Sequence, residues 1–176
     1  MTNKFVLINS YSQKNVGDAA ILNSTVELIS GISNLEIIVS TRYYKEDHGL
    51  SNNVQVVPPI ISFAAPGEKN DILRMVEFLV DSIFMFSLGF FYQFFPKIAR
   101  HVLHFFRPKL GRFLGTPNHI VIASGGGYFY SNQKTLNLSF LHSAFSIIVA
   151  KLFNHEIVMM PQSIGPIRKK LDAYVL

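Results

Sequence analysis

The chain has 176 residues, of which 49% are hydrophobic and 15% charged, and its formal net charge is +5. This composition excludes a globally disordered chain and is sufficient for one domain with a buried core. The absence of cysteine excludes disulfides, cysteine metal sites and cysteine nucleophiles. The positive charge favours anionic partners in general: nucleotide sugars, phosphorylated small molecules, acidic lipid surfaces or nucleic acid.

The amino-terminal residues lack the pattern of a secretory signal. The apolar run at residues 5–8 is short and is followed directly by Asn9 and Ser10. A secretory signal has an apolar stretch of about 7–15 residues and a small-residue cleavage site. We therefore expect a cytoplasmic protein, with which the absence of cysteine is compatible.

The first third of the chain alternates strand-like and helix-like patterns. Residues 5–8, 36–40 and 54–57 are short apolar runs that are typical of buried strands. Between the first two runs, Asp18 is a suitable N-cap for a helix with one apolar side. Gly31 is suited to ending that helix.

The same alternation resumes in the last third. Residues 119–123 and 156–160 predict two further strands, separated by a glycine-rich turn and by a helix from about 135 to 153. A β-α-β order is typical of parallel strands covered by helices. The sequence therefore predicts an α/β, Rossmann-like domain over residues 1–176. Its open, mostly parallel sheet should have at least five strands and helices on both faces.

A Phe-rich segment, about residues 71–112, interrupts this alternation and is predicted to be a helical insertion. Its apolar core, residues 83–92, is shorter than the roughly 20 residues of a membrane-spanning helix. A basic stretch follows, up to Arg112. Two interpretations stay open. The segment is either a helical hairpin packed on the domain or on a second domain, or an amphipathic element on an anionic membrane surface.

Three loops follow the carboxyl ends of predicted strands, where open parallel sheets bind ligands. Residues 15–18 combine a glycine with the free N–H groups of a helix start, which suit an anion. Residues 124–131 include three successive glycines that let a ligand approach the backbone. Residues 161–166 offer neutral hydrogen-bonding groups before a sharp turn. Each loop alone has an ordinary explanation as a cap or a turn. Together they predict a crevice for a phosphorylated or sugar-like ligand.

Nine residues of these loops are our candidate substrate-binding positions. They are Asn15, Gly17, Asp18, Gly125, Gly126, Gly127, Gln162, Ser163 and Gly165. The sequence assigns no catalytic acid or base, because H-E-x-x-H, G-x-S-x-G and paired-carboxylate patterns are absent. His101 and His104 lie one turn apart without a third ligand, so we expect no metal site. No nucleic-acid-binding signature is present, so we expect no nucleic-acid partner.

In order and spacing, these motifs resemble those of polysaccharide pyruvyl transferases. The resemblance is carried by residues 15–22 (NVGDAAIL), 124–129 (SGGGYF) and 161–166 (PQSIGP), and it extends over nearly the whole chain. The third motif is the most specific and the glycine triplet the least. Two features depart from the family pattern: the loop before Asn15 lacks glycines, and the Phe-rich insertion is long and unusually apolar.

The resemblance implies an enzyme that transfers a pyruvyl group from phosphoenolpyruvate to a sugar. The sugar belongs to a cell-surface polysaccharide (an exopolysaccharide or cell wall polymer) or to its lipid-linked precursor. Phosphoenolpyruvate is then the donor substrate, and no cofactor is expected. The expected partners are the sugar or lipid-linked oligosaccharide acceptor and, peripherally, the anionic inner face of the membrane.

The resemblance also implies a two-domain, glycosyltransferase-B-like architecture with the active site between the domains. The family's basic donor-binding residues and a functional histidine lie largely in the second domain. We expect that domain to be missing from this chain and the chain alone to be inactive. Two further hypotheses stay open: a glycosyltransferase of two-domain type, and a truncated, non-catalytic module that binds sugars or a membrane surface.

Overall fold

The computed structural model describes residues 4–10, 14–32, 35–45, 50, 53–63, 70–116, 119–124, 126–131 and 138–167, with only the backbone described for 126–131 and 162–167. Five strands form one parallel sheet in the order β3-β2-β1-β4-β6. The strands are β1 (Phe5–Ile8), β2 (Ile37–Ser40), β3 (Val54–Val57), β4 (Ile120–Ala123) and β6 (Glu156–Met159). This confirms the predicted α/β, Rossmann-like parallel sheet. The strand order reverses between β1 and β4, so a topological switch point lies there.

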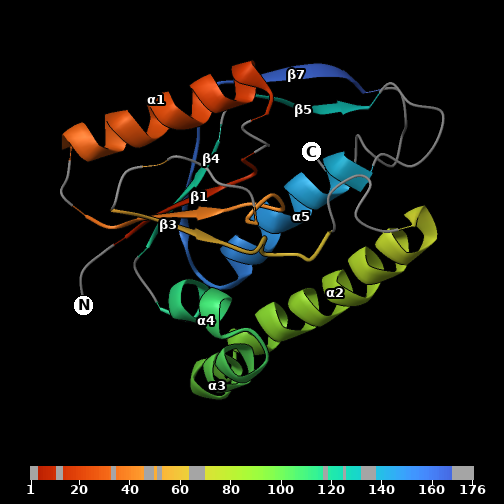
Figure 1. The fold of residues 1–176 in the computed structure, drawn as a ribbon. Helices are drawn as coiled ribbons and strands as arrows, with labels where there is room; N and C mark the ends of the chain where they lie inside the picture. The colour runs from red at the N-terminus through yellow and green to blue at the C-terminus, as the bar shows by residue number, and fades with distance from the viewer. Residues whose placement is uncertain are drawn as a thin grey trace.

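Helices cover both faces of the sheet, as predicted. Helix α1 (Val16–Ile32) lies on one face and helix α5 (Leu138–Leu152) on the other (Figure 1). Side chains alternate along β1, since successive residues of a strand point to opposite faces. Leu7 belongs to the apolar cluster with α1, whereas Val6 and Ile8 belong to the larger cluster with α5.

A second, two-stranded sheet corrects two of the predicted loops. Strands β5 (Gly126–Ser131) and β7 (Gln162–Ile167) pair in parallel, with Gly126 opposite Gln162. The prediction that the glycine-rich segment and the segment after residue 161 are turns was therefore wrong. The pairing joins segments that are far apart in the chain. It provides hydrogen-bond partners for backbone N–H and C=O groups that neither segment could pair by itself. Local turn preferences do not reveal such a partner.

The start of α1 is also corrected. The Asn15 side-chain oxygen accepts a hydrogen bond from the Gly17 amide at 3.0 Å, and the Asn15 carbonyl accepts one from the Ala19 amide at 2.9 Å. Asn15 is therefore the N-cap, and the prediction that Asp18 fills this role was wrong. Asn caps a helix as well as Asp does, so the earlier residue takes the position. Asp18 lies in the first turn, where a negative charge favours the positive end of the helix.

Other boundaries differ from prediction by a few residues. Helix α1 continues through Gly31 to Ile32, β4 begins at Ile120, and α5 (Leu138–Leu152) ends one residue before the predicted 153. Gly31 does not end the helix because it lies within its last turn. Helix ends depend on hydrogen bonds of the last turn, which sequence patterns locate only within a few residues.

The Phe-rich insertion forms three helices: α2 (Asp71–Tyr92), α3 (Pro96–Phe106) and α4 (Pro108–Leu114). The inner side of α2 packs against α5 with Phe78 and Met85 fully buried. At Gly89 an added Cβ would lie 2.9 Å from the Leu152 Cβ, so the two helices approach closely. The insertion is therefore packed on the domain, as one of the two interpretations predicted.

Arg107 holds the insertion to the loop after β3. It lies between α3 and α4 and donates to the Ile60 carbonyl at 3.0 Å, to the Ser62 hydroxyl and to the Asp81 carboxylate of α2. The Ser62 amide donates to the same carboxylate. Burial raises the pKa of Asp81, and the Arg107 guanidinium opposes that rise. This network joins three segments that the sequence places far apart.

The outer side of α2 is apolar and exposed. By length and composition α2 could cross a membrane: the mean hydropathy is 1.6 over an 18-residue window, of which 33% is buried. A core helix passes the same test, and the inner side of α2 is packed against α5. Hydropathy alone therefore does not distinguish a spanning helix from a helix that lies on the domain.

Candidate functional site at the carboxyl edge of the sheet

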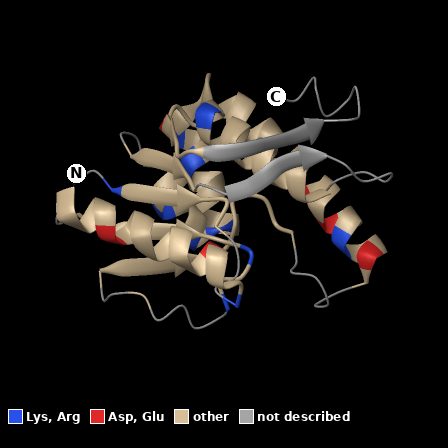
Figure 2. Cartoon of the chain, turned by 90° about the horizontal axis from the view of Figure 1, so that it is seen from above, with Lys and Arg blue, Asp and Glu red and all other residues tan. Residues whose placement is uncertain are grey.

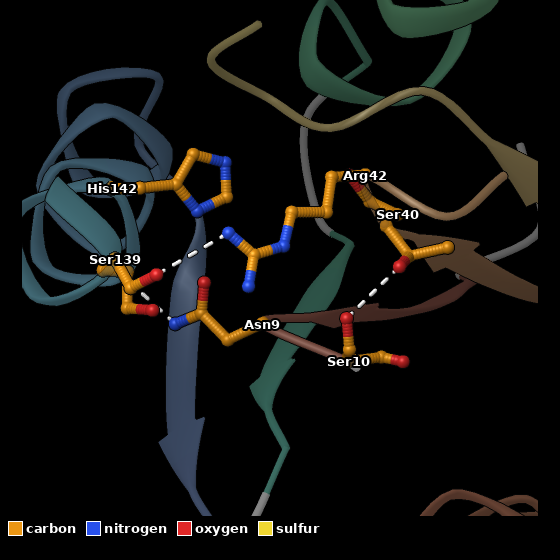
Figure 3. A pocket seen from close by; sticks show the side chains of 8 residues that line it. Asn9, Ser10, Ser40, Arg42, Ser139 and His142 are labelled. Atoms are coloured by element: carbon orange, nitrogen blue, oxygen red, sulfur yellow. Dashed lines mark hydrogen bonds between the residues drawn. The ribbon is translucent and has the colours of Figure 1, made fainter. Parts of the chain in front are cut away.

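A small polar pocket lies at the carboxyl edge of the sheet, beside the switch point. It is formed by residues directly after β1, by the end of β2 and the residues after it, and by the first turns of α5. The lining residues are Asn9, Ser10, Ser40, Thr41, Arg42, Ser139, His142 and Ser143. Figure 3 shows Arg42 reaching across the pocket toward Ser139, with Asn9 and His142 on either side. Open parallel sheets bind ligands at this position.

Asn9 ends β1 in an unusual backbone conformation. Its φ angle is +62°, a left-handed conformation that Asn adopts more readily than most residues. The side-chain amide of Asn9 donates to the Ser143 carbonyl of α5 at 3.2 Å. The turn after β1 is thus held against α5. Strained backbone of this kind concentrates at functional sites.

Hydroxyl groups hold the neighbouring turns together. The Thr41 hydroxyl donates to the Ser10 carbonyl at 2.9 Å, and the Ser40 hydroxyl donates to the Pro58 carbonyl at 3.1 Å. Asn9 and Ser10 are each 7% exposed. Within the described part of the chain, the Asn9 Oδ1 and Ser10 Oγ atoms have no hydrogen-bond partner. Buried polar atoms are normally paired, so these two oxygens are candidates for contact with a ligand.

Arg42 supplies the positive charge of the pocket. Its guanidinium donates to the Ser139 hydroxyl at 3.3 Å and lies over the rings of Tyr43 and Phe63, at 5.1 and 5.5 Å from the ring centroids. The aromatic contacts hold the planar guanidinium in a fixed orientation. A guanidinium held in this way suits a carboxylate or a phosphate, which it binds through two parallel hydrogen bonds.

His142 is a neutral member of the pocket. Its Nε2 lies 3.1 Å from the Ile61 carbonyl, which can only accept, so Nε2 carries the hydrogen. Burial and the nearby Arg42 charge lower the pKa of His142 to about 3, against the hydrogen bond to Ile61. His142 therefore adds no positive charge at neutral pH, and Arg42 carries the charge of the pocket.

The closed part of the pocket is small. Its volume of about 10 Å³ is enough for roughly one water molecule. A sugar or an organic phosphate therefore has to lie over the pocket and contact its rim, rather than enter it. The pocket offers such a ligand one cation and several neutral hydrogen-bonding groups.

The predicted site residues begin at the same edge of the sheet. The segments that contain them follow β1, β4 and β6, which are neighbours in the parallel sheet. Asn15 and Gly17 are exposed at the start of α1, and burial raises the pKa of the neighbouring Asp18.

The other candidates lie in or beside the small sheet. The structure places the backbones of Gly126 and Gly127 in β5 and those of Gln162, Ser163 and Gly165 in β7. Gly125 is outside the described residues. The substrate-binding role of all nine candidates stays a prediction.

The sequence reasoning missed the polar residues that line the pocket. In the sequence, Asn9 and Ser10 mark the end of a strand, and none of the three motifs includes Arg42. Their position could have revealed them. Polar residues follow β1 directly, another polar residue ends β2, and two more come after it. The contribution of Ser139 and His142 needed the tertiary structure, since α5 is more than 90 residues away in the chain.

The described residues contain no group of three or more His, Asp or Glu side chains that could hold a metal ion. His101 and His104 both line an open groove between α3 and α4, together with Arg100 and Arg112. That groove is on the insertion, away from the strand ends that form the polar pocket. Its neighbours are basic, which disfavours a cation.

Fold and pocket together define an α/β protein with a polar pocket at the carboxyl edge of a parallel sheet. The family model described as polysaccharide pyruvyl transferase matches residues 15–175. The chain therefore belongs to the polysaccharide pyruvyl transferase family, which confirms the resemblance of the three motifs. Membership indicates a transferase with a polysaccharide acceptor. Comparisons with curated proteins and with solved structures gave no significant match.

Proposed function

We propose that this protein transfers a pyruvyl group from phosphoenolpyruvate to a sugar of a cell-surface polysaccharide or of its lipid-linked precursor. The carboxyl edge of the sheet would form one wall of the substrate site. The observation that carries this proposal is the polar pocket with Arg42 at the switch point of a chain in this family. We place the reaction in the cytoplasm, and the donor itself supplies the leaving group, so no cofactor is needed.

The proposed reaction forms a pyruvate ketal. One sugar hydroxyl adds to C2 of phosphoenolpyruvate while C3 takes up a proton, and the C–O bond to phosphate then breaks. A second hydroxyl of the same sugar adds to C2 and completes the ketal. Of the two hydroxyl protons, one balances the proton taken up by C3 and the other leaves with the phosphate. The negative charge on the departing phosphate needs a positively charged partner.

The pocket residues have chemically distinct roles in this proposal. Arg42 would bind the carboxylate or the phosphate of the donor, since these groups match the planar fork of a guanidinium. A water molecule in the closed part of the pocket would link the buried Asn9 Oδ1 and Ser10 Oγ atoms to a sugar hydroxyl at the rim, since water and hydroxyls both donate and accept. Because His142 is held neutral, Arg42 supplies the positive charge that the donor contacts in this pocket.

The test is an assay of phosphate release from phosphoenolpyruvate by the full-length protein, across a panel of glycan acceptors. We expect release only with a suitable acceptor. Arg42→Gln should lower kcat/KM about 10- to 100-fold, the effect of losing one or two charge-assisted hydrogen bonds. Lys151→Gln, an exposed cation in the last turn of α5, is the matched control and should retain activity.

The same experiment separates the proposal from its alternatives. Absence of phosphate release with every acceptor would count against pyruvyl transfer. If the protein instead binds a nucleotide sugar and does not bind phosphoenolpyruvate, a glycosyltransferase is favoured. If Arg42→Gln and Lys151→Gln behave alike, the pocket has no part in donor binding.

A further inference from the structure

The outer side of α2 and α3 exposes several large apolar side chains. Phe105 is 81% exposed and Phe90 is 64% exposed. We call the following residues the aromatic surface: Phe90, Phe94, Phe95, Ile98, Phe105 and Phe106. Each is more than half exposed. Soluble monomeric proteins rarely leave large apolar patches in water unless the patch binds something.

Rings of the aromatic surface contact neighbouring rings between α2 and α3 and at the end of α2. Phe84 of α2 meets Phe106 of α3 with ring centroids 5.9 Å apart, and Phe106 meets Phe105 at 5.1 Å. At the end of α2, Phe90 meets Phe94 at 5.4 Å. The exposed rings of Phe105 and Phe106 therefore form one contacting pair, and those of Phe90 and Phe94 form another.

A basic groove lies beside the aromatic surface. It runs between α3 and α4, has a volume of about 400 Å³, and includes Arg100, His101, His104 and Arg112. On α3, His101 lies between Ile98 and Phe105 on one helical face, since residues three, four and seven apart share a face. Apolar and basic groups are thus exposed together.

The charges of this region have one sign. No Asp or Glu occurs from residue 82 to residue 155. The helices α3 and α4, with the residue between them, carry Lys97, Arg100, Arg107, Lys109 and Arg112. Figure 2 shows the charged residues of α2 in one half of that helix, which the sequence identifies as its first half. A surface that joins exposed phenylalanines to cations without acidic residues is complementary to a bilayer that carries anionic headgroups.

The contacts of α2 favour a position on the membrane surface over one across it. A spanning α2 would have to separate from α5, against which Phe78, Met85 and Leu88 are buried. It would also have to break the ion pair between Asp81 and Arg107. An interfacial helix keeps these inner contacts and inserts only its outer side.

We infer that the aromatic surface and the basic groove dock this protein on a bilayer that contains anionic lipids. The phenylalanine rings insert at the level of the headgroups, and the cations of α3 and α4 lie against the lipid phosphates. This inference concerns a different surface from the substrate pocket and does not depend on the proposed reaction.

The first measurement is co-sedimentation of the full-length protein with vesicles at low ionic strength. Vesicles of phosphatidylcholine with about one third phosphatidylglycerol should retain the protein, and pure phosphatidylcholine vesicles should retain much less. Raising the salt from about 0.1 M to 1 M should release most of it, because the Debye length falls from about 10 Å to 3 Å.

Two sets of variants then measure the contributions of the cations and of the phenylalanines to vesicle binding separately. Lys97→Gln/Lys109→Gln/Arg112→Gln removes exposed cations and should weaken binding at least tenfold, since one cation near an anionic surface contributes roughly a fivefold change in affinity. Phe94→Ser/Phe105→Ser should also weaken binding at least tenfold.

Each set has a matched control elsewhere on the molecule. Lys14→Gln/Lys45→Gln/Lys151→Gln removes the same charge from other exposed positions. Val16→Ser/Ile32→Ser removes the two most exposed apolar side chains of α1, on the other face of the sheet. The controls should bind vesicles like the unaltered protein, and circular dichroism should show all variants to be folded.

The inference fails under any of three results. The first is that the protein fails to sediment with anionic vesicles at low salt. The second is that it sediments equally well with neutral vesicles. The third is that the test variants bind vesicles as well as their controls do. The first result would indicate that the aromatic surface contacts a protein partner or another domain instead of a bilayer.

Discussion

The carboxyl edge of the sheet and the helical insertion depart from an ordinary soluble domain in opposite ways. At the edge, polar atoms of Asn9 and Ser10 are buried without a partner among the described residues. On the insertion, large apolar side chains such as Phe105 are exposed. Each arrangement lowers the stability of the isolated protein, because buried polar groups need partners and exposed apolar groups order water. The comparison teaches that the edge offers polar groups and the insertion offers apolar ones, which suits the polar ligand proposed at the edge and the anionic bilayer inferred at the insertion.

The largest expected effect comes from separating the insertion from the sheet. Arg107→Met leaves the buried Asp81 carboxylate without its charged partner and should lower the free energy of unfolding by about 3 kcal/mol. Urea denaturation measures this change. Arg74→Met is the control, because Arg74 pairs with the exposed Asp71, and such pairs contribute about 1 kcal/mol or less. Equal losses in both variants would show that Arg107 does not hold the insertion in place.

A smaller effect is expected from the contact that shapes the basic groove. Gly111→Ala would place its Cβ 2.7 Å from the His104 Cα, a backbone atom that can move only if α3 and α4 separate. We expect a loss of about 1–3 kcal/mol in urea denaturation. The control is Gly31→Ala in α1, where a Cβ meets nothing within 4 Å and the exchange should stabilise by up to about 1 kcal/mol. A stabilised Gly111→Ala variant would contradict the close packing of α3 on α4.

Acid should weaken the edge of the sheet. The pKa of His142 is about 3 in the folded chain, below the value of about 6.5 expected when unfolded. Between these values the unfolded chain binds a proton that the folded chain does not, so stability falls as the pH falls below about 6.5 and is unaffected above it. One pH unit below 6.5, His142 alone should contribute a loss of about 1 kcal/mol. His142→Gln retains a donor for the Ile61 carbonyl and should reduce the dependence measured by urea midpoints from pH 7 to 5. An unchanged dependence would show that His142 is protonated in the folded protein.

The last comparison concerns the turn after β1, where two variants should differ by about 1 kcal/mol. Asn9→Gly retains access to a positive φ but loses the hydrogen bond to the Ser143 carbonyl, so we expect a loss of about 1 kcal/mol. Asn9→Ala loses the same bond and also disfavours the backbone conformation, so its loss should be larger by about 1 kcal/mol. The two unfolding free energies are compared directly. If Ala is tolerated as well as Gly, the backbone at this position is not constrained.

Local sequence patterns predicted most of the helices and strands, but they did not predict which distant segments pair with each other. The strand at residues 5–8 and the strand at 54–57 were predicted with the observed boundaries, because each is a short apolar run with a clear end. Asp18 precedes an apolar helical pattern and so matches an N-cap, although Asn15, three residues earlier, suits that role equally well and fills it. The segments that form β5 and β7 contain glycine and proline, which are typical of turns, so their pairing with each other was not predicted.

The sequence motifs predicted at which edge of the sheet a site should lie, but they did not predict the residues that line the polar pocket. The motifs begin at the same edge of the sheet as the polar pocket, because parallel strands place their carboxyl ends together. They did not identify Arg42 or His142, whose side chains meet only when α5 packs over β1 and β2.

The sequence by itself determined the α/β class, the parallel sheet, the helical insertion and the family, because periodicity and motif spacing are properties of neighbouring residues. Only the tertiary structure decided that β5 pairs with β7, that Arg107 joins α2 to the loop after β3, and that Asn9, Arg42 and His142 line one pocket. The tertiary structure also decided which side of the insertion is buried and which is exposed. The physical reason is that each of these features needs groups from distant segments to meet, and packing of the whole chain selects which segments do so.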